Sequence, residues 1–120
     1  MIQMLPCRDK EQLAALNREE GSSAGFAYCM YEGGRMTGYL LYDIAGGEGI
    51  LRAAKAETDE LFDGLVRAVL GSLDDIHIRA ARFDEAFGRE RMERLGFVVK
   101  GDNTIPEIAE IFHHCKNCKM

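Results

Sequence analysis

Long apolar runs are absent from this sequence, and none approaches the roughly 20 residues that a membrane span requires. The first nine residues also lack the charged head and long apolar stretch of a secretory signal peptide. Basic residues are outnumbered, with 15 Lys and Arg against 20 Asp and Glu and a formal net charge of −5. Because binding to phosphates needs a basic surface, this balance excludes a general nucleic-acid binder. We therefore expect a cytoplasmic protein with neither a membrane nor a nucleic acid as partner.

Serine-nucleophile patterns, a P-loop and a dinucleotide-binding fingerprint are also missing. No internal repeat or low-complexity linker divides the chain. Its 120 residues, of which 47% are hydrophobic, suffice for one domain with its own core. We expect that domain over residues 1–112, followed by a compositionally distinct tail over residues 113–120.

The first elements that the sequence does predict are a strand and a capped helix. Ile2–Leu5 can form a short strand, which Pro6 ends. Asp9, with Gln12 three residues later, is typical of a capping box and predicts a helix over Lys10–Glu19.

A glycine-turned hairpin is predicted over Phe26–Ile44, because Gly33 and Gly34 supply the positive φ angles that tight turns need. Both faces of its strands carry apolar residues, which favours a sheet covered by helices on both sides. A second glycine turn leads to a strand over Ile50–Ala54.

Helical periodicity is clearest in the segment that follows. Seven apolar residues at helical spacing define one broad buried face: Leu61, Phe62, Leu65, Val66, Val69, Leu70 and Leu73. Strict alternation then predicts a strand over Ile76–Ala81, in which His77 is structural.

The stretch after that strand predicts a helix and a further strand. Asp84 can cap a helix whose apolar positions include Met92, and Gly96 stands where a left-handed terminating residue is needed. Phe97–Val99 would start the next strand. The spacing of isoleucines in Ile105–Phe112 fits either a helix or a last strand.

From about Phe26 to Phe112, this order of elements resembles the GCN5-related N-acetyltransferase (GNAT) superfamily, of which the chain would be a short and degenerate form. The resemblance implies an α+β fold of the three-layer α/β type. In this fold a mixed, mostly antiparallel sheet is flanked by helices. It favours Ile105–Phe112 as a closing strand paired with Phe97–Val99. It also implies that the strand at Ile50 splays from the following strand and opens a cleft for the pantetheine of acetyl-CoA.

The resemblance further implies a cofactor site in two parts. The strand backbone would hold pantetheine at Ile50, Leu51, Arg52, Ala53 and Ala54. The start of the long helix would lie beside the phosphates, at Thr58, Asp59, Glu60 and Leu61. The implied activity is acyl-CoA-dependent N-acetyl transfer to an amine of a small molecule or a protein.

Three features depart from the family pattern. Glu57 to Phe62 replaces the glycine-rich phosphate loop; Thr58 can cap the helix itself, and the carboxylates around it repel phosphates. Met92 stands where many members carry a general-acid tyrosine, and it cannot donate a proton; Glu85 replaces an asparagine. The short segment between the first two strands implies an acceptor site that is truncated or completed by a partner chain, for example in a homodimer.

Two functions therefore stay open: an acyl-CoA-dependent N-acetyltransferase, for which no catalytic residue is assigned, and a non-catalytic binding or regulatory module of the same fold. Asp43 and Glu48 could serve as a base near an amine or be ordinary turn acids. Cys29 is expected to be a small buried hydrophobe. Four tyrosines are expected in the core or on the sheet surface: Tyr28, Tyr31, Tyr39 and Tyr42.

The tail carries a separate candidate site made of His113, His114, Cys115 and Cys118. Imidazoles and thiolates suffice for tetrahedral zinc or another transition metal. The spacing is too compressed for all four to reach one ion. A site of both cysteines and one histidine, completed by a partner chain or by Cys7, is one interpretation, and a solvated tail is the other.

Overall fold

The computed structural model describes residues 1–117, with the backbone alone for Ala86 and residues 113–117. The elements in chain order are β1 (Ile2–Pro6), α1 (Lys10–Glu20), β2 (Phe26–Glu32), β3 (Arg35–Ala45), β4 (Glu48–Lys55), α2 (Asp59–Asp75), β5 (Ala80–Phe83), the 3₁₀ turn η1 (Glu85–Phe87), α3 (Arg89–Arg94), β6 (Thr104–Ile105) and α4 (Ile108–Asn117).

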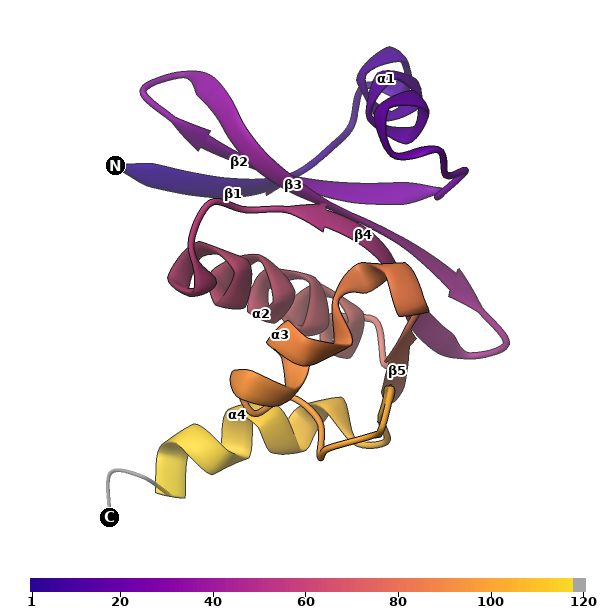
Figure 1. The fold of residues 1–120 in the computed structure, drawn as a ribbon, viewed down its shortest axis with the longest axis vertical. Coiled ribbons are helices and arrows are strands. Elements are labelled where there is room, and N and C mark those ends of the chain that lie inside the picture. Colours follow the sequence, from indigo (N-terminus) through magenta and orange to yellow (C-terminus); the bar gives the residue numbers. More distant parts are fainter. Residues whose placement is uncertain (118–120) are drawn as a thin grey trace.

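All six strands form one sheet in the order β1-β2-β3-β4-β5-β6. Neighbouring strands are antiparallel except for β4 and β5, which are parallel. A parallel pair needs a crossover connection, and α2 provides it. Helix α1 lies over one face of the sheet, whereas α2, α3 and α4 lie on the other (Figure 1). The expected three-layer arrangement with a mixed, mostly antiparallel sheet is confirmed.

The two faces carry separate cores. The larger core lies between the sheet and α2, whose predicted apolar stripe is buried from Phe62 to Leu73. The smaller core lies under α1 and includes Leu16 and Cys29. Cys29 has no exposed surface, which confirms the expectation of a buried small hydrophobe.

Helix α1 forms where the sequence predicts it, with one change in its cap. The Asp9 carboxylate accepts the N–H of Glu11 at 2.9 Å, and Gly21 ends the helix at a φ of 67°. Gln12 does not complete a capping box; its side chain accepts the thiol of Cys7.

The strand expected over Ile76–Ala81 is wrong at its start. The Leu73 carbonyl accepts the N–H groups of Ile76 and Ile78, so this segment closes helix α2 rather than pairing with β4. His77 takes a positive φ of 67° in the resulting turn. The strand itself spans Ala80–Phe83.

The helix expected after Asp84 is divided into η1 and α3 by Gly88, whose φ is 107°. Asp84 does not cap it with its side chain, because its carboxylate binds Arg52 instead. Gly96 takes a φ of 85°, as a terminating glycine should.

The strand expected over Phe97–Val99 is also wrong, and so is the strand expected over Ile105–Phe112. Thr104 and Ile105 form the short strand β6, which pairs with β5. From Ile108 the chain is helical, so the helical interpretation of the isoleucine spacing was the right one. Ile108 is fully buried, and its N–H donates to the Arg79 carbonyl at 2.8 Å. Helix α4 continues to Asn117, past residue 112.

Candidate functional site

The parallel strands β4 and β5 run together for four residue pairs and then diverge. Glu48 pairs with Ala80 at one end, and Leu51 pairs with Phe83 at the other. The Asp84 N–H still donates to the Leu51 carbonyl at 3.1 Å, after which the chain turns into η1. Among the described residues, no strand pairs with this side of β4 beyond Leu51.

A β-bulge marks the point of divergence. Tyr42 of β3 pairs with Leu51 while the adjacent Leu41 pairs with Ala53, so Arg52 is the extra residue of β4. A bulge bends its strand and re-aims the bulged side chain. Of the predicted pantetheine residues, Ile50 and Leu51 therefore pair with both β3 and β5, Arg52 is the bulged residue, and Ala53 and Ala54 pair, among the described strands, only with β3.

Arg52 ties the diverging strands together. Its Nε lies 3.0 Å from Asp43 Oδ2 and its Nη1 lies 2.9 Å from Asp84 Oδ2. Hydrogen bonds to Asp84 and to Asp43 raise the pKa of Arg52, so this side chain stays charged. Asp43 Oδ1 also accepts the N–H of Gly25 at 2.7 Å. With both oxygens engaged, Asp43 is poorly placed to act as a free base; Glu48 is likewise paired, with Arg82 at 3.3 Å.

Aromatic side chains fill the space beneath η1. The ring of Phe87 lies 5.5 Å from that of Phe62 and 6.0 Å from that of Phe83, and all three are buried. Met92 has no exposed surface and belongs to the same core. Met92, at the position where many GNAT members carry a general-acid tyrosine, therefore serves in packing.

The start of α2 is capped by its own chain. Thr58 Oγ1 accepts the N–H of Leu61 at 3.1 Å, as the sequence predicts for a self-capped helix. The Asp59 carboxylate accepts hydrogen bonds from Arg91 at 2.8 Å and from Arg94 at 3.0–3.1 Å. The hydrogen bonds from Arg94 and, to a lesser extent, from Arg91 lower the pKa of the Asp59 carboxyl. Of the four residues predicted beside the phosphates, Thr58 and Leu61 thus form the helix cap, and Asp59 is paired with two arginines.

Arg91 and Arg94 did not emerge from the sequence as site residues. Their spacing of three places them on the same side of a helix, which was the available signal. The arginines of this region alternate with acids, a pattern that is equally typical of a solvated helix face. Only the packing of α3 beside the start of α2 brings both side chains to Asp59.

Cys7, Cys29, Tyr31 and Tyr39 pack in the core on the α1 side, whereas Tyr28 and Tyr42 pack in the core on the α2 side. The Tyr39 hydroxyl donates to Glu20. Burial and, to a lesser extent, this hydrogen bond raise the pKa of Tyr39. Tyr42 is buried as well. Burial raises the pKa of the Cys29 thiol to about 12, with Cys7 beside it.

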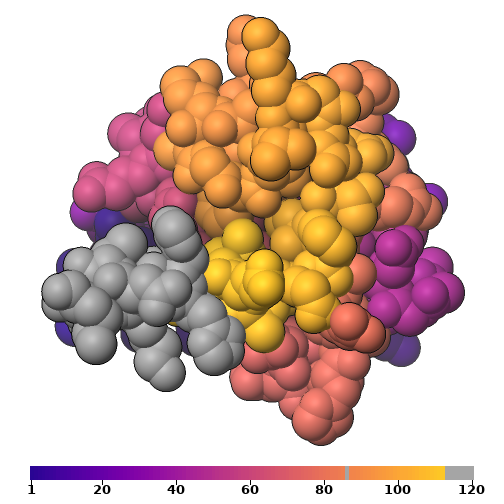
Figure 2. All heavy atoms as spheres, turned by 90° about the horizontal axis from the view of Figure 1, so that it is seen from below, coloured from indigo at the N-terminus to yellow at the C-terminus, as the bar shows by residue number. Residues whose placement is uncertain are grey.

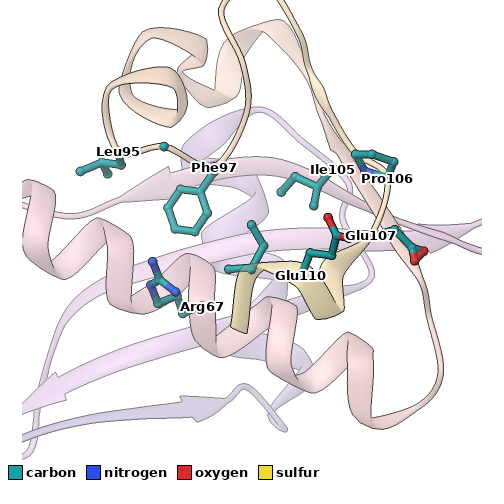
Figure 3. A pocket seen from close by; sticks show the side chains of 9 residues that line it. Arg67, Leu95, Phe97, Ile105, Pro106, Glu107 and Glu110 are labelled. Atoms are coloured by element: carbon teal, nitrogen blue, oxygen red, sulfur yellow. The ribbon is translucent and has the colours of Figure 1, made fainter. Parts of the chain in front are cut away.

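A cavity of about 450 Å³ lies between α2, the loop after α3, β6 and the start of α4, on the side of the molecule that Figure 2 shows. Its lining consists of Arg67, Leu95, Gly96, Phe97, Ile105, Pro106, Glu107, Glu110 and Ile111 (Figure 3). Arg67 stacks over Phe97 at 5.3 Å and pairs with Asp63 at 2.9 Å. None of the residues predicted for the cofactor site lines this cavity.

The predicted metal ligands lie in the last residues of the chain. The side chains of His113, His114 and Cys115, and all of Cys118, fall outside the described residues. Within the part that is described, no group of three or more His, Cys, Asp or Glu side chains could hold a metal ion. No described helix is long and apolar enough to cross a membrane.

Solved structures with this arrangement of elements include three bacterial proteins. The ribosomal-protein-S18-alanine N-acetyltransferase from Escherichia coli matches with a TM-score of 0.59 at 14% identity, over 87% of this chain and 89% of that one. A GNAT family acetyltransferase from Brucella melitensis in complex with acetyl-CoA matches with a TM-score of 0.57 at 13% identity, over 82% and 84%. YhhK from Escherichia coli, bound to coenzyme A, matches with 0.55 at 12% identity, over 87% and 96%.

No protein-family model and no curated protein matches the sequence itself. At these identities the structural likeness speaks for architecture and not for activity. Each of the three matches covers most of this chain and most of the other chain, with a TM-score above 0.5. The chain therefore has the fold of the GNAT acetyltransferases.

Proposed function

We propose that this chain binds acyl-CoA along the free edge of β4 and transfers the acyl group to an amine of a small molecule or a protein. The observation that carries the proposal is the divergence of β4 from β5 after Leu51. Among the described residues no strand pairs with the β5 side of β4 beyond Leu51, so the backbone N–H and C=O groups on that side could pair with an extended, amide-containing chain such as pantetheine. Two structural neighbours hold coenzyme A or acetyl-CoA, which supports the same ligand here.

The proposed reaction is direct transfer. The nitrogen of a neutral amine attacks the thioester carbonyl carbon, a C–N bond forms, the C–S bond breaks, and the thiolate of CoA leaves. The proton released by the new ammonium goes to water. An alkyl thiol has a pKa of about 8.5, so its thiolate can leave near neutral pH without a dedicated acid. This matters because Met92, buried at the family's acid position, supplies no proton.

A second candidate is a non-catalytic binding or regulatory module of the same fold. Two observations favour it: the complete burial of Met92, and the carboxylate of Asp59 at the start of α2, where nucleotide phosphates would lie. In this case the fold is retained while acyl transfer is lost. A partner chain, including a second copy, could then use the surface that acceptor-binding elements would otherwise form.

Calorimetry with acetyl-CoA, paired with a thiol-release assay across a panel of primary amines, separates the two candidates. Binding together with amine-dependent release of CoA supports the acetyltransferase. Binding without release, or no binding by a folded protein, supports the non-catalytic module. S-acetylpantetheine serves as the matched probe, because it keeps the part of the ligand that would lie along β4 and lacks the nucleotide phosphates.

A further inference from the structure

The cavity between α2, the loop after α3, β6 and α4 has the size and the apolar wall of a small-molecule site. Its volume of about 450 Å³ lies within the range of roughly 300–1,000 Å³ that ligand sites occupy. Phe97 and Ile105 in its lining are only 5% and 3% exposed, so part of the wall belongs to the core. Leu95 and Ile111, both partly buried, extend this apolar wall. Such a wall favours a ligand with an apolar body, which loses contact with water on binding.

Four separate elements supply the lining (Figure 3). Arg67 comes from α2, Phe97 from the loop after α3, Ile105 from β6 and Glu110 from α4. None of the described lining residues belongs to β4 or β5. The cavity is therefore a different place from the edge of β4, and its ligand is not the acyl-CoA proposed there.

Three charged side chains are among the described lining residues, and two of them already have a partner of opposite charge. Arg67 Nε lies 2.9 Å from Asp63 Oδ2, and Glu107 is paired with Arg79. Glu110 is exposed, and no ion pair or hydrogen bond joins its carboxylate to another described residue. Within the described chain, the lining therefore has one negative charge that no arginine or lysine matches.

This balance favours a cation over an anion. An anion would have to compete for Arg67, whose guanidinium is bound to Asp63 and stacked over Phe97 at 5.3 Å. A cation can approach Glu110 without displacing any described side chain from it. A single ion pair at an exposed site contributes about fivefold in affinity or less, so the apolar body must supply the rest.

We propose that this cavity binds a small organic cation, namely a primary amine with an aromatic or branched apolar body. The ammonium group lies against the Glu110 carboxylate, and the apolar body packs on Phe97 and Ile105. A ligand placed in this way contacts α2, the loop after α3, β6 and α4 at once, and so holds α4 against the rest of the domain. The role is binding, and no bond is made or broken.

The test uses phenethylammonium as the probe, with two matched compounds. Phenethyl alcohol has nearly the same shape without the charge, and hydrocinnamate carries the opposite charge. In ligand-observed NMR titrations of wild type, we expect the ammonium to bind about fivefold more tightly than the alcohol, and hydrocinnamate to bind most weakly. Glu110→Gln should remove the preference for the ammonium, and Glu110→Lys should reverse the order of the ammonium and hydrocinnamate.

Glu60→Gln is the control variant, because Glu60 is an exposed acid of α2 that does not line the cavity. It should keep the preference of wild type. Equal losses of ammonium affinity in Glu60→Gln and Glu110→Gln would overturn the proposal, because the negative charge of the whole protein would then explain them.

Phenethyl alcohol reports whether the cavity itself is intact in the variants. It should bind Glu110→Gln as it binds wild type, and the melting temperatures of the two proteins should agree. If none of the probes binds wild type at millimolar concentration, the proposal is wrong. It is also wrong if the ammonium binds wild type, Glu110→Gln and Glu110→Lys alike, because the ligand would then lie elsewhere on the protein.

Discussion

Arg52 donates from Nη1 to Asp84 Oδ2 at 2.9 Å, and so joins the bulge of β4 to the residue that follows β5. The pair spans the point where the two strands part. Because the side chains are 33% and 38% exposed, solvent weakens the interaction, and its contribution to stability is modest.

Replacing Arg52 with Met should lower the free energy of unfolding by about 1 kcal/mol, because the contacts to Asp84 and Asp43 are both lost. Arg82→Met is the matched control: it removes one longer pair, with Glu48, and should cost about 0.5 kcal/mol or less. Urea unfolding measures both. Equal losses in the two variants would contradict the bridging role of Arg52.

Replacing Met92 with Tyr should destabilise the protein by about 1–3 kcal/mol without creating acyl transfer. Met92 is fully buried in a packed core, so a larger side chain with a hydroxyl has neither space nor a partner there. Met92→Leu, close in volume, should cost less than about 1.5 kcal/mol. Thermal unfolding and the thiol-release assay provide the readouts; a stable Met92→Tyr protein with increased acyl transfer would refute this account of the site.

Two glycine-to-alanine substitutions should act in opposite directions. A Cβ at Gly38 would lie 2.5 Å from the Lys55 carbonyl oxygen, so β3 and β4 would have to shift, at a cost of about 1–3 kcal/mol. A Cβ at Gly71, inside α2, meets only Phe112 at 3.8 Å, and alanine there should stabilise the helix by about 1 kcal/mol. Chemical unfolding of both variants, beside wild type, checks the signs.

Cys29 should resist alkylation in the folded protein. Burial raises the pKa of its thiol to about 12, and the thiolate is the reactive form. We expect iodoacetamide at pH 8 to leave Cys29 unmodified in native protein and to modify it after unfolding in guanidinium, as read by mass spectrometry of its peptide. Rapid labelling under native conditions would show that the α1 side opens readily.

The histidine and cysteine cluster at the end of the chain remains a prediction of a zinc or other transition-metal site. Elemental analysis of protein purified without a histidine tag should find about one equivalent per site. Cys115→Ser combined with Cys118→Ser should remove the metal and any metal-linked dimer. If wild-type protein contains no zinc, iron or nickel, the solvated-tail interpretation holds.

The sequence predicted the fold best where a single segment determines its own structure. The paired glycines at Gly33 and Gly46 defined hairpins, and the apolar stripe of α2 defined its buried face. Predictions failed where two structures compete for the same residues. Ile76 and Ile78 alternate like a strand, yet their N–H groups close the preceding helix at the carbonyl of Leu73.

The candidate site was predictable only in part, because much of it depends on packing between distant segments. Thr58 could be identified as a cap from its neighbours alone. The bulge at Arg52 requires the register of β3 against β4, which no local pattern encodes. The arginines at Asp59 require α3 to pack beside α2, so their role emerges only from the folded chain.

The single parallel pairing in the sheet has a consequence for the order of folding. Strands β1 to β4 follow one another mostly through short turns and can pair through local contacts, whereas β5 can join β4 only after the chain of α2 has crossed the sheet. Distant pairings close larger loops and form later. We therefore expect hydrogen exchange during refolding to protect β2 to β4 first and β5 last. Until β5 pairs with β4, the edge of β4 that faces it would be exposed, both during refolding and during synthesis.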